Sequence, residues 1–448
     1  MNVTAQLVDN IFEYSNKVPD EVLAKTQELV LDALGVAIAG SKTAEGEIIA
    51  KFVQDMRGTG QATVIGMENP MDPVRAALAN GTMGYSIGLT DTHALSITHP
   101  GSAIIPAALA VAEQEGRSGE ELLKAITLGY EVVTRLGRAI NPSHRARGFH
   151  TSATCNPFGA ATAAALLLGC TKEQLTWALG IAGSTSSGLF EFRQNGDMTM
   201  AFHGGWPAQS GVTAAYMAKK GFTGPKTILE GQDGFFKAMS DKHDAVIINQ
   251  DFGKRFSVEA MSLRAYCACR YAHTAIEAIG KMKKRRNGIA AADLQEITVY
   301  THKTAIDQET EPNTLVGARL CTVFNLALAI LYGPKLTEIQ QSDLHDEKVL
   351  EVYKKIKVIE DPNMTAQFPQ LWTSRVAVKF TDGTMDEETM DYAKGDPANP
   401  MSSEEITNKF QFITSSVMTP AKAEGFLNKI NRLRSISVRE LMQTLAKI

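Results

Sequence analysis

The sequence predicts a mainly α-helical protein in which a large all-helical domain is joined to a smaller α+β domain. Apolar residues recur at helical spacing through about the first 250 residues, and they alternate at strand spacing after about residue 290. Helical spacing then returns from Ser402 to the end of the chain. A length of 448 residues suits two or three domains.

The amino-terminal segments combine apolar periodicity with helix-start signals. Apolar residues between positions 22 and 38 follow a helical period after Pro19, a residue type favoured in a first helical turn. Capping boxes at residues 118–121 and 171–174 precede two further apolar runs. The alanine-rich stretch at residues 159–166 predicts a helix that packs closely with both sides buried.

The later segments mix strand and helix signals. Residues 297–301 and 376–380 alternate as half-buried strands do, and the second run leads into Asp382-Gly383, a hairpin signal. A helical pattern covers residues 322–331, and the polar segment 395–400 is typical of a linker. Because helices resume after this linker, we expect them to return to the first domain.

These patterns predict a discontinuous helical domain and an inserted α+β domain. We place the helical domain at residues 1–265 and 400–448, and the α+β domain at residues 266–399. The net charge of −4 and the pI near 6.2 indicate neither a nucleic-acid nor a membrane partner. The start of the chain lacks the pattern of a signal peptide, which favours a cytoplasmic protein.

The cysteines give no sign of a disulfide framework or a zinc site. The chain has five, an odd number, and the closest pair, Cys267 and Cys269, is a C-x-C. We therefore expect reduced thiols, as is usual in the cytosol.

Four segments place histidine or arginine beside tight turns. They are residues 91–101, 144–150, 203–210 and 264–273. A single loop histidine is more often a structural hydrogen-bond partner than a catalyst, and a single arginine is often a solvated surface charge. The recurrence of such segments favours an active site, because rigid elements that present polar loops are how such sites are built.

This set of side chains suits proton transfer beside a carboxylate. Imidazole is a good general acid or base at neutral pH, and guanidinium groups hold carboxylates in a fixed geometry. Phosphate-loop, H-E-x-x-H, G-x-S-x-G and dinucleotide-binding motifs are absent from the sequence. The segments alone do not choose between an enzyme of this kind, a metal-dependent hydrolase with histidine ligands, and a protein that only binds its ligand.

Almost the whole chain resembles the MmgE/PrpD family, which includes 2-methylcitrate dehydratase, cis-aconitate decarboxylase and iminodisuccinate epimerase. The most specific pieces are Gly148-Phe-His-Thr-Ser and Phe202-His-Gly-Gly-Trp. The other similar segments are residues 31–40, 62–66, 79–82, 98–100, 155–160, 394–400 and 409–410.

The resemblance implies a helical domain built from both chain ends, an α+β lid domain, a homodimer, and catalysis without metal or organic cofactor. It implies a small polycarboxylate as the substrate. The catalytic residues that it implies, together with the acid beside them, are His99, His150, Asp91 and Thr92. The expected substrate-binding residues are His93, Arg147, His203, Arg264, Cys269, Arg270 and His273.

The chain departs from the family pattern at several positions. In the family's aspartate-rich segment, Tyr85 stands where a histidine is usual and Gly88 stands where the first aspartate is usual, so that only Asp91 remains. Met200 replaces a lysine, Arg264 replaces another lysine, and a tyrosine seen in decarboxylases is Phe324; these are the positions at which we expect any change of reaction.

The function that we predict is a cofactor-independent lyase, either a dehydratase or a decarboxylase of citrate-like acids. In this hypothesis His99 or His150 transfers the proton, and Arg264 and Arg270 hold carboxylates. The alternatives are an epimerase of the iminodisuccinate type, which needs two bases on opposite faces of one carbon, and a catalytically silent homologue that binds polycarboxylates.

Overall fold

A computed structural model of the chain describes residues 2–307, 309–336, 339–446 and 448. The chain forms two compact units. The helical unit comprises Met1–Phe190, Thr199–Met261 and Ser402–Ile448, and the α+β unit comprises Glu191–Met198 and Ser262–Met401. Residues 191–198, 262–265 and 400–401, which the expected boundaries placed in the helical domain, thus lie in the α+β unit.

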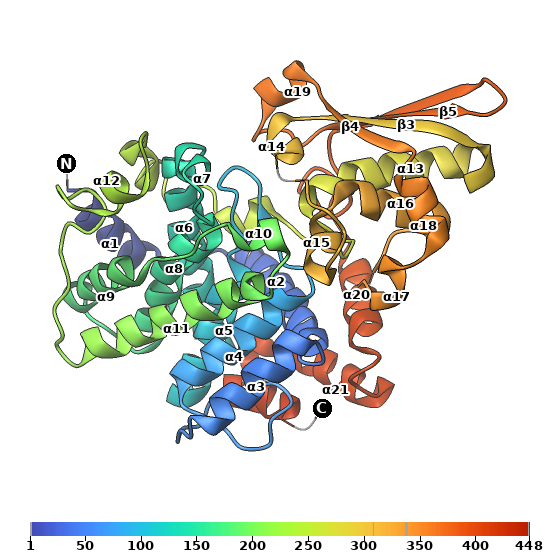
Figure 1. Cartoon of the computed structure of the whole chain (residues 1–448). Coiled ribbons are helices and arrows are strands. Elements are labelled where there is room, and N and C mark those ends of the chain that lie inside the picture. The colour runs from blue at the N-terminus through green and yellow to red at the C-terminus, as the bar shows by residue number, and fades with distance from the viewer. Residues whose placement is uncertain (1, 308, 337–338, 447) are drawn as a thin grey trace. The chain divides into compact units, whose positions relative to one another are not determined.

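The helical unit is built from both ends of the chain (Figure 1). Its helices before residue 262 are α1 (Val3–Tyr14), α2 (Asp20–Gly40), α3 (Ala44–Asp55), α4 (Pro73–Ser86), α5 (Gly101–Glu115), α6 (Gly119–Ile140), α7 (Ser143–Ala146), α8 (Thr151–Leu167), α9 (Lys172–Thr185), α11 (Thr199–Lys219) and α12 (Phe235–Met239). The short strand β1 (Thr92–His93) lies between α4 and α5, and β2 (Met261–Ser262) lies at the unit boundary. The returning helices are α20 (Ser403–Thr414), α21 (Pro420–Asn431) and α22 (Val438–Met442).

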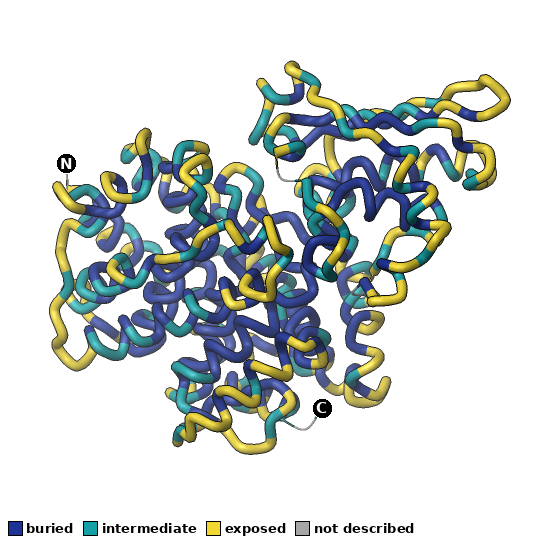
Figure 2. Tube along the Cα trace, viewed as in Figure 1, coloured by how far each residue is buried: buried dark blue, intermediate teal, exposed yellow. Residues whose placement is uncertain are grey.

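Helix α8 lies in the interior of this unit. Of its residues, all except Leu166 are buried, because small side chains let neighbouring helices approach from every side. The helices that contact it are α5, α6, α9 and α11, and Figure 2 shows buried residues through the middle of the unit. The predicted close packing of the alanine-rich stretch is confirmed.

The capping signals read from the sequence are present. Ser118 and Thr171 each accept a hydrogen bond from the backbone N–H three residues on, and Glu121 and Gln174 complete the two capping boxes. The returning helix α20 begins with the same motif at Ser402.

The α+β unit holds helices on a small mixed sheet. Its longer elements are α13 (His273–Arg285), β3 (Leu294–Thr301), α15 (Leu315–Leu320), α16 (Thr322–Tyr332), α18 (Glu347–Tyr353), β4 (Ile356–Glu360), α19 (Pro362–Gln367), β5 (Ser374–Phe380) and β6 (Met385–Met390). Its one-turn helices are α10 (Phe192–Asn195), α14 (Lys303–Ile306) and α17 (Gln341–Leu344).

The sheet order is β4-β3-β5-β6. Strand β3 pairs with β4 in parallel and with β5 antiparallel, and β5 and β6 form the predicted hairpin around Gly383. Val376 and Val378 lie opposite Val299 and Ile297, and these four side chains join Phe324 in one apolar core. The predicted fold class, mainly helical with a smaller α+β part, is confirmed. Within the described residues, no helix has both the length and the apolar character needed to cross a membrane.

Candidate active site

The loop between α4 and α5 forms the centre of the candidate site in the helical unit. Asp91 anchors this loop, since one carboxylate oxygen accepts a hydrogen bond from the backbone N–H of Gly101 at 3.0 Å. The other oxygen accepts from the Tyr130 hydroxyl at 2.7 Å. An added Cβ at Gly101 would lie 2.9 Å from the carboxylate, so this contact requires glycine. Asp91 thus fixes the loop to the start of α5 and to α6.

The hydrogen bonds of His99 show which of its two ring nitrogens carries the proton. Its Nδ1 lies 2.7 Å from the carbonyl oxygen of Asp91, which can only accept, so Nδ1 carries the proton and donates. The hydroxyl of Thr92 lies 3.2 Å from the same nitrogen. The main chain of His99 is fixed by α8: its N–H donates to Ser152 Oγ at 2.9 Å, and its carbonyl accepts from Asn156 at 3.1 Å. This arrangement leaves Nε2 of a half-buried imidazole to accept a proton, and to donate it once protonated, as a general base or acid does.

His150, the residue before α8, lies beside the same centre. Its Nδ1 lies 2.9 Å from Nδ1 of His203 on α11, and its Nε2 lies 3.3 Å from the hydroxyl of Tyr85 at the end of α4. The Tyr85 ring has its centroid 5.7 Å from that of His99 and 6.0 Å from that of His150. The structure therefore brings His99, His150 and His203 together around Tyr85.

Glycines on two helices allow this arrangement. A Cβ at Gly204 would lie 2.3 Å from the carbonyl oxygen of Gly81 and 2.8 Å from the Cβ of Tyr85. A Cβ at Gly205 would lie 2.2 Å from the carbonyl oxygen of Leu78. Helix α11 therefore contacts the backbone of α4 directly, which places His203 one residue from the helix crossing.

The two buried imidazoles remain neutral at pH 7. Burial lowers the pKa of His150 well below its ordinary value, and the nearby imidazoles of His203 and His99 lower it further. Burial also lowers the pKa of His203 to about 4. Because both rings are neutral, one Nδ1 must donate to the other.

Two of the predicted substrate-binding residues have other partners. His93 is buried within its own loop, where its Nδ1 shares a hydrogen bond of 2.8 Å with Ser96, and burial lowers its pKa to about 3. Arg147 is exposed and pairs with Asp241 at 3.2 Å. These contacts are typical of a structural loop residue and of a surface ion pair.

The remaining predicted residues lie in the α+β unit and gather around Cys269. Arg270 donates to Asp396 at 3.1 Å, while its Nη1 is buried without a partner among the described residues. Burial, opposed by Asp396, lowers the pKa of Arg270 to about 10, and the like charge of Arg264 contributes. Arg264 also lies close enough to Cys269 to oppose the rise that burial causes in the thiol pKa.

His273 completes this group at the start of α13. Its Nε2 lies 3.2 Å from the carbonyl oxygen of Ala268, so this nitrogen donates, and its ring packs against Tyr266. Arg264 bonds the same carbonyl at 3.4 Å. The group therefore presents cationic donors with few carboxylates, which is the character of an anion-binding site.

Several residues that contact the site were not predicted from the sequence. Tyr85 and Tyr130 lie in helical patterns, where a tyrosine is ordinarily a packing residue. Arg145, rather than Arg147, stacks on Phe190 with a centroid distance of 3.7 Å and adds positive charge near His150. For Tyr85 alone the sequence held a signal, because it stands at the histidine position of the family's aspartate-rich segment.

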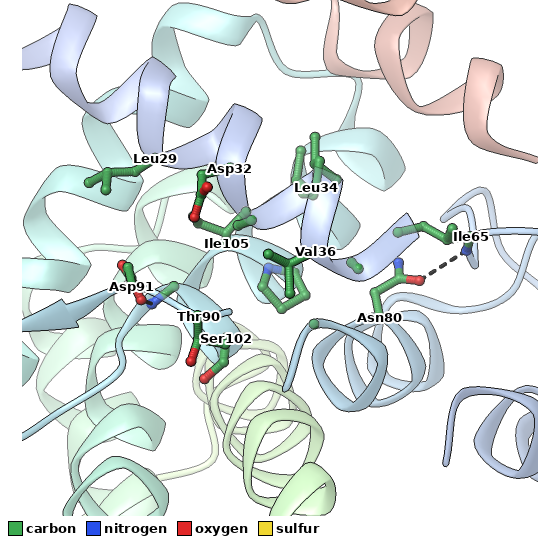
Figure 3. Close-up of a pocket in the computed structure, with 16 residues that line it drawn as sticks. Leu29, Asp32, Leu34, Val36, Ile65, Asn80, Thr90, Asp91, Ser102 and Ile105 are labelled. Atoms are coloured by element: carbon green, nitrogen blue, oxygen red, sulfur yellow. Dashed lines mark hydrogen bonds between the residues drawn. The ribbon is translucent and has the colours of Figure 1, made fainter. Parts of the chain in front are cut away.

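A small cavity lies behind the Asp91 loop (Figure 3). Its volume is about 20 Å³, and its polar lining comes from Asp32, Asn80, Thr90, Asp91 and Ser102. A cavity of that size holds about one water molecule, so it is too small for a polycarboxylate. Across the described ranges, no three His, Cys, Asp or Glu side chains are grouped to hold a metal ion.

Three of the positions that depart from the family pattern lie in surroundings that suit the residues present. Gly88 has a φ of +68°, a backbone conformation that favours glycine. Met200 is buried in α11, and Phe324 is fully buried in the apolar core of the α+β unit.

The chain matches two family models, the MmgE/PrpD N-terminal domain over residues 6–247 and the MmgE/PrpD C-terminal domain over residues 266–434. It is 26% identical to the cis-aconitate decarboxylase-like protein oryM of Aspergillus oryzae, over 98% of this chain and 96% of that protein. It is 25% identical to a cis-aconitate decarboxylase of Aspergillus terreus, over 94% of this chain and 92% of that protein. It is 24% identical to the cis-aconitate decarboxylase of Mus musculus, over 96% and 90% respectively. The two family models together cover most of the sequence, and the chain therefore belongs to the MmgE/PrpD family.

Proposed function

We propose that the protein is a cofactor-independent lyase that decarboxylates a small unsaturated di- or tricarboxylate of the cis-aconitate type. The observation that carries this proposal is the fixed tautomer of His99, whose Nδ1 donates to the Asp91 carbonyl. The relatives named as cis-aconitate decarboxylases support the choice of reaction.

Decarboxylation requires one proton to be supplied. Loss of CO2 breaks a carbon–carbon bond and leaves an electron pair, which the neighbouring unsaturated carboxylate takes up by delocalisation. One proton then adds to carbon. His99 in its protonated form donates this proton from Nε2 and becomes neutral, while the Asp91 carbonyl keeps its hydrogen bond to Nδ1 in both states.

Arg264 and Arg270 hold the substrate carboxylates in this proposal. Arg270 has a buried donor, Nη1, that no described residue accepts from, and a carboxylate would satisfy it. Moving the charged carboxylates of a substrate from water into a buried site is favourable only when cations such as these pair with them. Cys269 and His273 belong to the same group of side chains as these two arginines. We further propose that the active form is a homodimer.

A product screen tests the proposal. The protein is incubated with cis-aconitate, citrate, 2-methylcitrate and iminodisuccinate in deuterated water, and products are followed by NMR. We expect loss of CO2 from cis-aconitate with one deuterium added to carbon, and no loss of activity after treatment with EDTA.

Other outcomes would replace the proposal with one of its alternatives. Dehydration of 2-methylcitrate would show a dehydratase, and deuterium at the α-carbon of iminodisuccinate without CO2 release would show an epimerase. Melting-temperature shifts with these acids but no turnover would show a protein that only binds them. Activity lost with EDTA and restored by a divalent ion would overturn the cofactor-independent mechanism.

A further inference from the structure

Three buried side chains, one from α4, one from the residue before α8 and one from α11, form a continuous series of hydrogen bonds in the helical unit. The Tyr85 hydroxyl lies 3.3 Å from Nε2 of His150, and Nδ1 of His150 lies 2.9 Å from Nδ1 of His203. Each of the three residues is only 5% exposed. Each neutral imidazole can accept a proton on one nitrogen and release one from the other, and the hydroxyl oxygen can accept a proton while it releases its own.

The two ends of this series of hydrogen bonds, at Tyr85 and at His203, lie in different surroundings. The Tyr85 ring lies against His99, the residue to which the proposed function assigns proton transfer. At the other end, Nε2 of His203 lies 3.5 Å from where a Cβ on Gly188 would be. Gly188 is followed by Leu189, whose side chain is 61% exposed, so this end lies beneath a segment that contacts solvent.

We propose that Tyr85, His150 and His203 form a proton relay that connects the surroundings of His99 with the protein surface at residues 188–189. This inference rests on the proposed function, because it supplies the proton that His99 uses. It assigns Tyr85 a positioning and relay role rather than direct contact with substrate.

The relay transfers one proton without charging either imidazole. In the first arrangement, His203 donates from Nδ1 to His150, and His150 donates from Nε2 to the Tyr85 oxygen. A proton enters at Nε2 of His203 and its Nδ1 proton moves to Nδ1 of His150. The Nε2 proton of His150 then moves to the Tyr85 oxygen, and Tyr85 releases its own hydroxyl proton toward His99.

The burial of the two histidines favours this mode of transfer. Burial lowers the pKa of both His150 and His203, so neither ring can store a proton as imidazolium at pH 7. The other groups near His150 are cationic or imidazole: Arg145, His144 and His99. A charged His150 would be repelled by Arg145, whereas a shifted hydrogen-bond pattern adds no charge.

The first test is kinetic, with cis-aconitate as the probe. Tyr85→Phe keeps the ring and removes the hydroxyl, and His203→Asn keeps a polar group opposite His150 but removes the second nitrogen. We expect each variant to lower kcat by at least about 10-fold with KM changed less than about 2-fold. Tyr216→Phe is the matched control, since its hydroxyl bonds Glu115 on the exposed side of α11. Wild-type kcat in both Tyr85→Phe and His203→Asn would overturn the relay.

The second test does not need turnover and so separates the relay from the proposed function. In protein labelled with 15N-histidine, His150 and His203 should both be neutral at pH 6, with one Nδ1 protonated and the other not. Tyr85→Phe should shift the signals of His150 and leave those of His302, in the α+β unit, unchanged. Two Nδ1-protonated rings, or a His150 that does not respond to Tyr85→Phe, would overturn the relay. A wild-type protein that converts none of the four acids would overturn the proposed function alone.

Discussion

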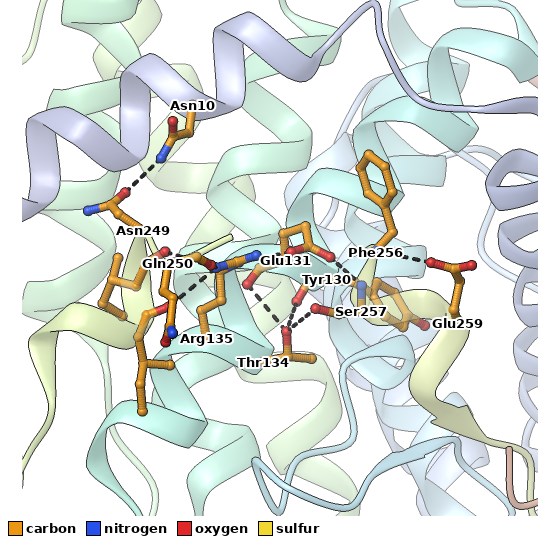
Figure 4. Close-up of polar contacts among 12 residues, drawn as sticks. Asn10, Tyr130, Glu131, Thr134, Arg135, Asn249, Gln250, Phe256, Ser257 and Glu259 are labelled. Carbon is orange, nitrogen blue, oxygen red and sulfur yellow. Dashed lines mark hydrogen bonds and ion pairs between the residues drawn. The ribbon is translucent and has the colours of Figure 1, made fainter. Parts of the chain in front are cut away.

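Arg135 in the helical unit and Arg270 in the α+β unit are both buried arginines that pair with a carboxylate, yet they differ in how their donors are used. Nε of Arg135 donates to Glu131 at 2.8 Å, and its Nη1 donates to the backbone carbonyls of residues 247, 248 and 250. The second oxygen of Glu131 accepts from the backbone N–H of Ser257 (Figure 4). This pair holds residues 247–257 against α6.

Arg270 makes fewer contacts for a similar degree of burial. One of its terminal nitrogens donates to Asp396, and the other has no partner among the described residues. A buried donor without an acceptor costs about 1–3 kcal/mol. The comparison teaches that the bonds of Arg135 to Glu131 and to three backbone carbonyls serve the fold, while the unused donor of Arg270 is the one that the proposed function gives to a substrate carboxylate.

His144 and His99 differ in the same way as the two arginines, and replacing His99 should have the largest effect on kcat. His144 has both nitrogens bonded within the protein, to the Met239 carbonyl and to Thr154, each at 2.8 Å. His99 is half-buried, and the Asp91 carbonyl fixes its Nδ1. We expect His99→Asn to lower kcat on cis-aconitate by roughly 10²–10⁴-fold with an unchanged melting temperature.

His144→Asn is the matched control and should do the reverse. It should lower the melting temperature and leave the specific activity of the folded protein unchanged, because a buried bonded histidine serves packing. If His99→Asn destabilised the protein and spared kcat, the catalytic assignment of His99 would be wrong.

The next largest effect concerns the buried pair of Glu131 and Arg135. Glu131→Gln removes the charge that Arg135 faces and should lower the free energy of unfolding by about 3–5 kcal/mol. The melting temperature should fall by something on the order of 5 °C, as followed by circular dichroism. KM should not change, since neither residue belongs to the candidate site. A Glu131→Gln protein as stable as wild type would mean that the backbone carbonyls alone satisfy Arg135.

The fold could be predicted from the sequence wherever the signal is local. The capping boxes at Ser118 and Thr171 and the alternation in β3 and β5 are local patterns, and the structure has them. Strand β4 was missed because it is an edge strand of five residues in which Ile356 alone is buried, so its alternation is brief. The assignment of residues 191–198 to the α+β unit depends on distant contacts, such as that of Gly196 with Thr314.

The site was predictable in part for the same reason. His99 and His150 lie in distinctive sequence segments, so their residue types and neighbours indicate chemistry. The partners of His150 come from α4 and α11, and they meet only because Gly81 and Gly204 let these helices touch. His93 and Arg147 lie in the same segments as His99 and His150, yet side-chain direction gives them different partners, which residue spacing cannot reveal.

A smaller effect, on KM rather than on stability, should distinguish Arg270 from Arg135. We expect Arg270→Gln to raise KM for cis-aconitate by about 10- to 100-fold, because one charge-assisted hydrogen bond is worth about 1.5–3 kcal/mol. The melting temperature should change little, since Asp396 also accepts from the backbone N–H of Ala398. Arg285→Gln, which alters an exposed arginine of the same unit that pairs with Asp386, is the control and should leave KM unchanged. A large loss of stability with an unchanged KM would make Arg270 a second structural pair.

The smallest effect is expected at Arg147, which the sequence placed among the substrate-binding residues. The Arg147 side chain is 37% exposed and pairs with Asp241, whose side chain is 72% exposed. Exposed pairs of this kind contribute about 0–1 kcal/mol, because water screens the charges and both side chains lose freedom. Arg147→Ala should therefore change the free energy of unfolding by less than about 1 kcal/mol and leave kcat and KM within about 2-fold of the wild-type values.

The informative comparison is Arg145→Ala, since Arg145 packs on Phe190 and its charge acts on His150. That variant should raise the pKa of His150, measured by NMR titration, while Arg147→Ala should not. A rise in KM with Arg147→Ala, with no change in stability, would support the prediction that Arg147 binds substrate.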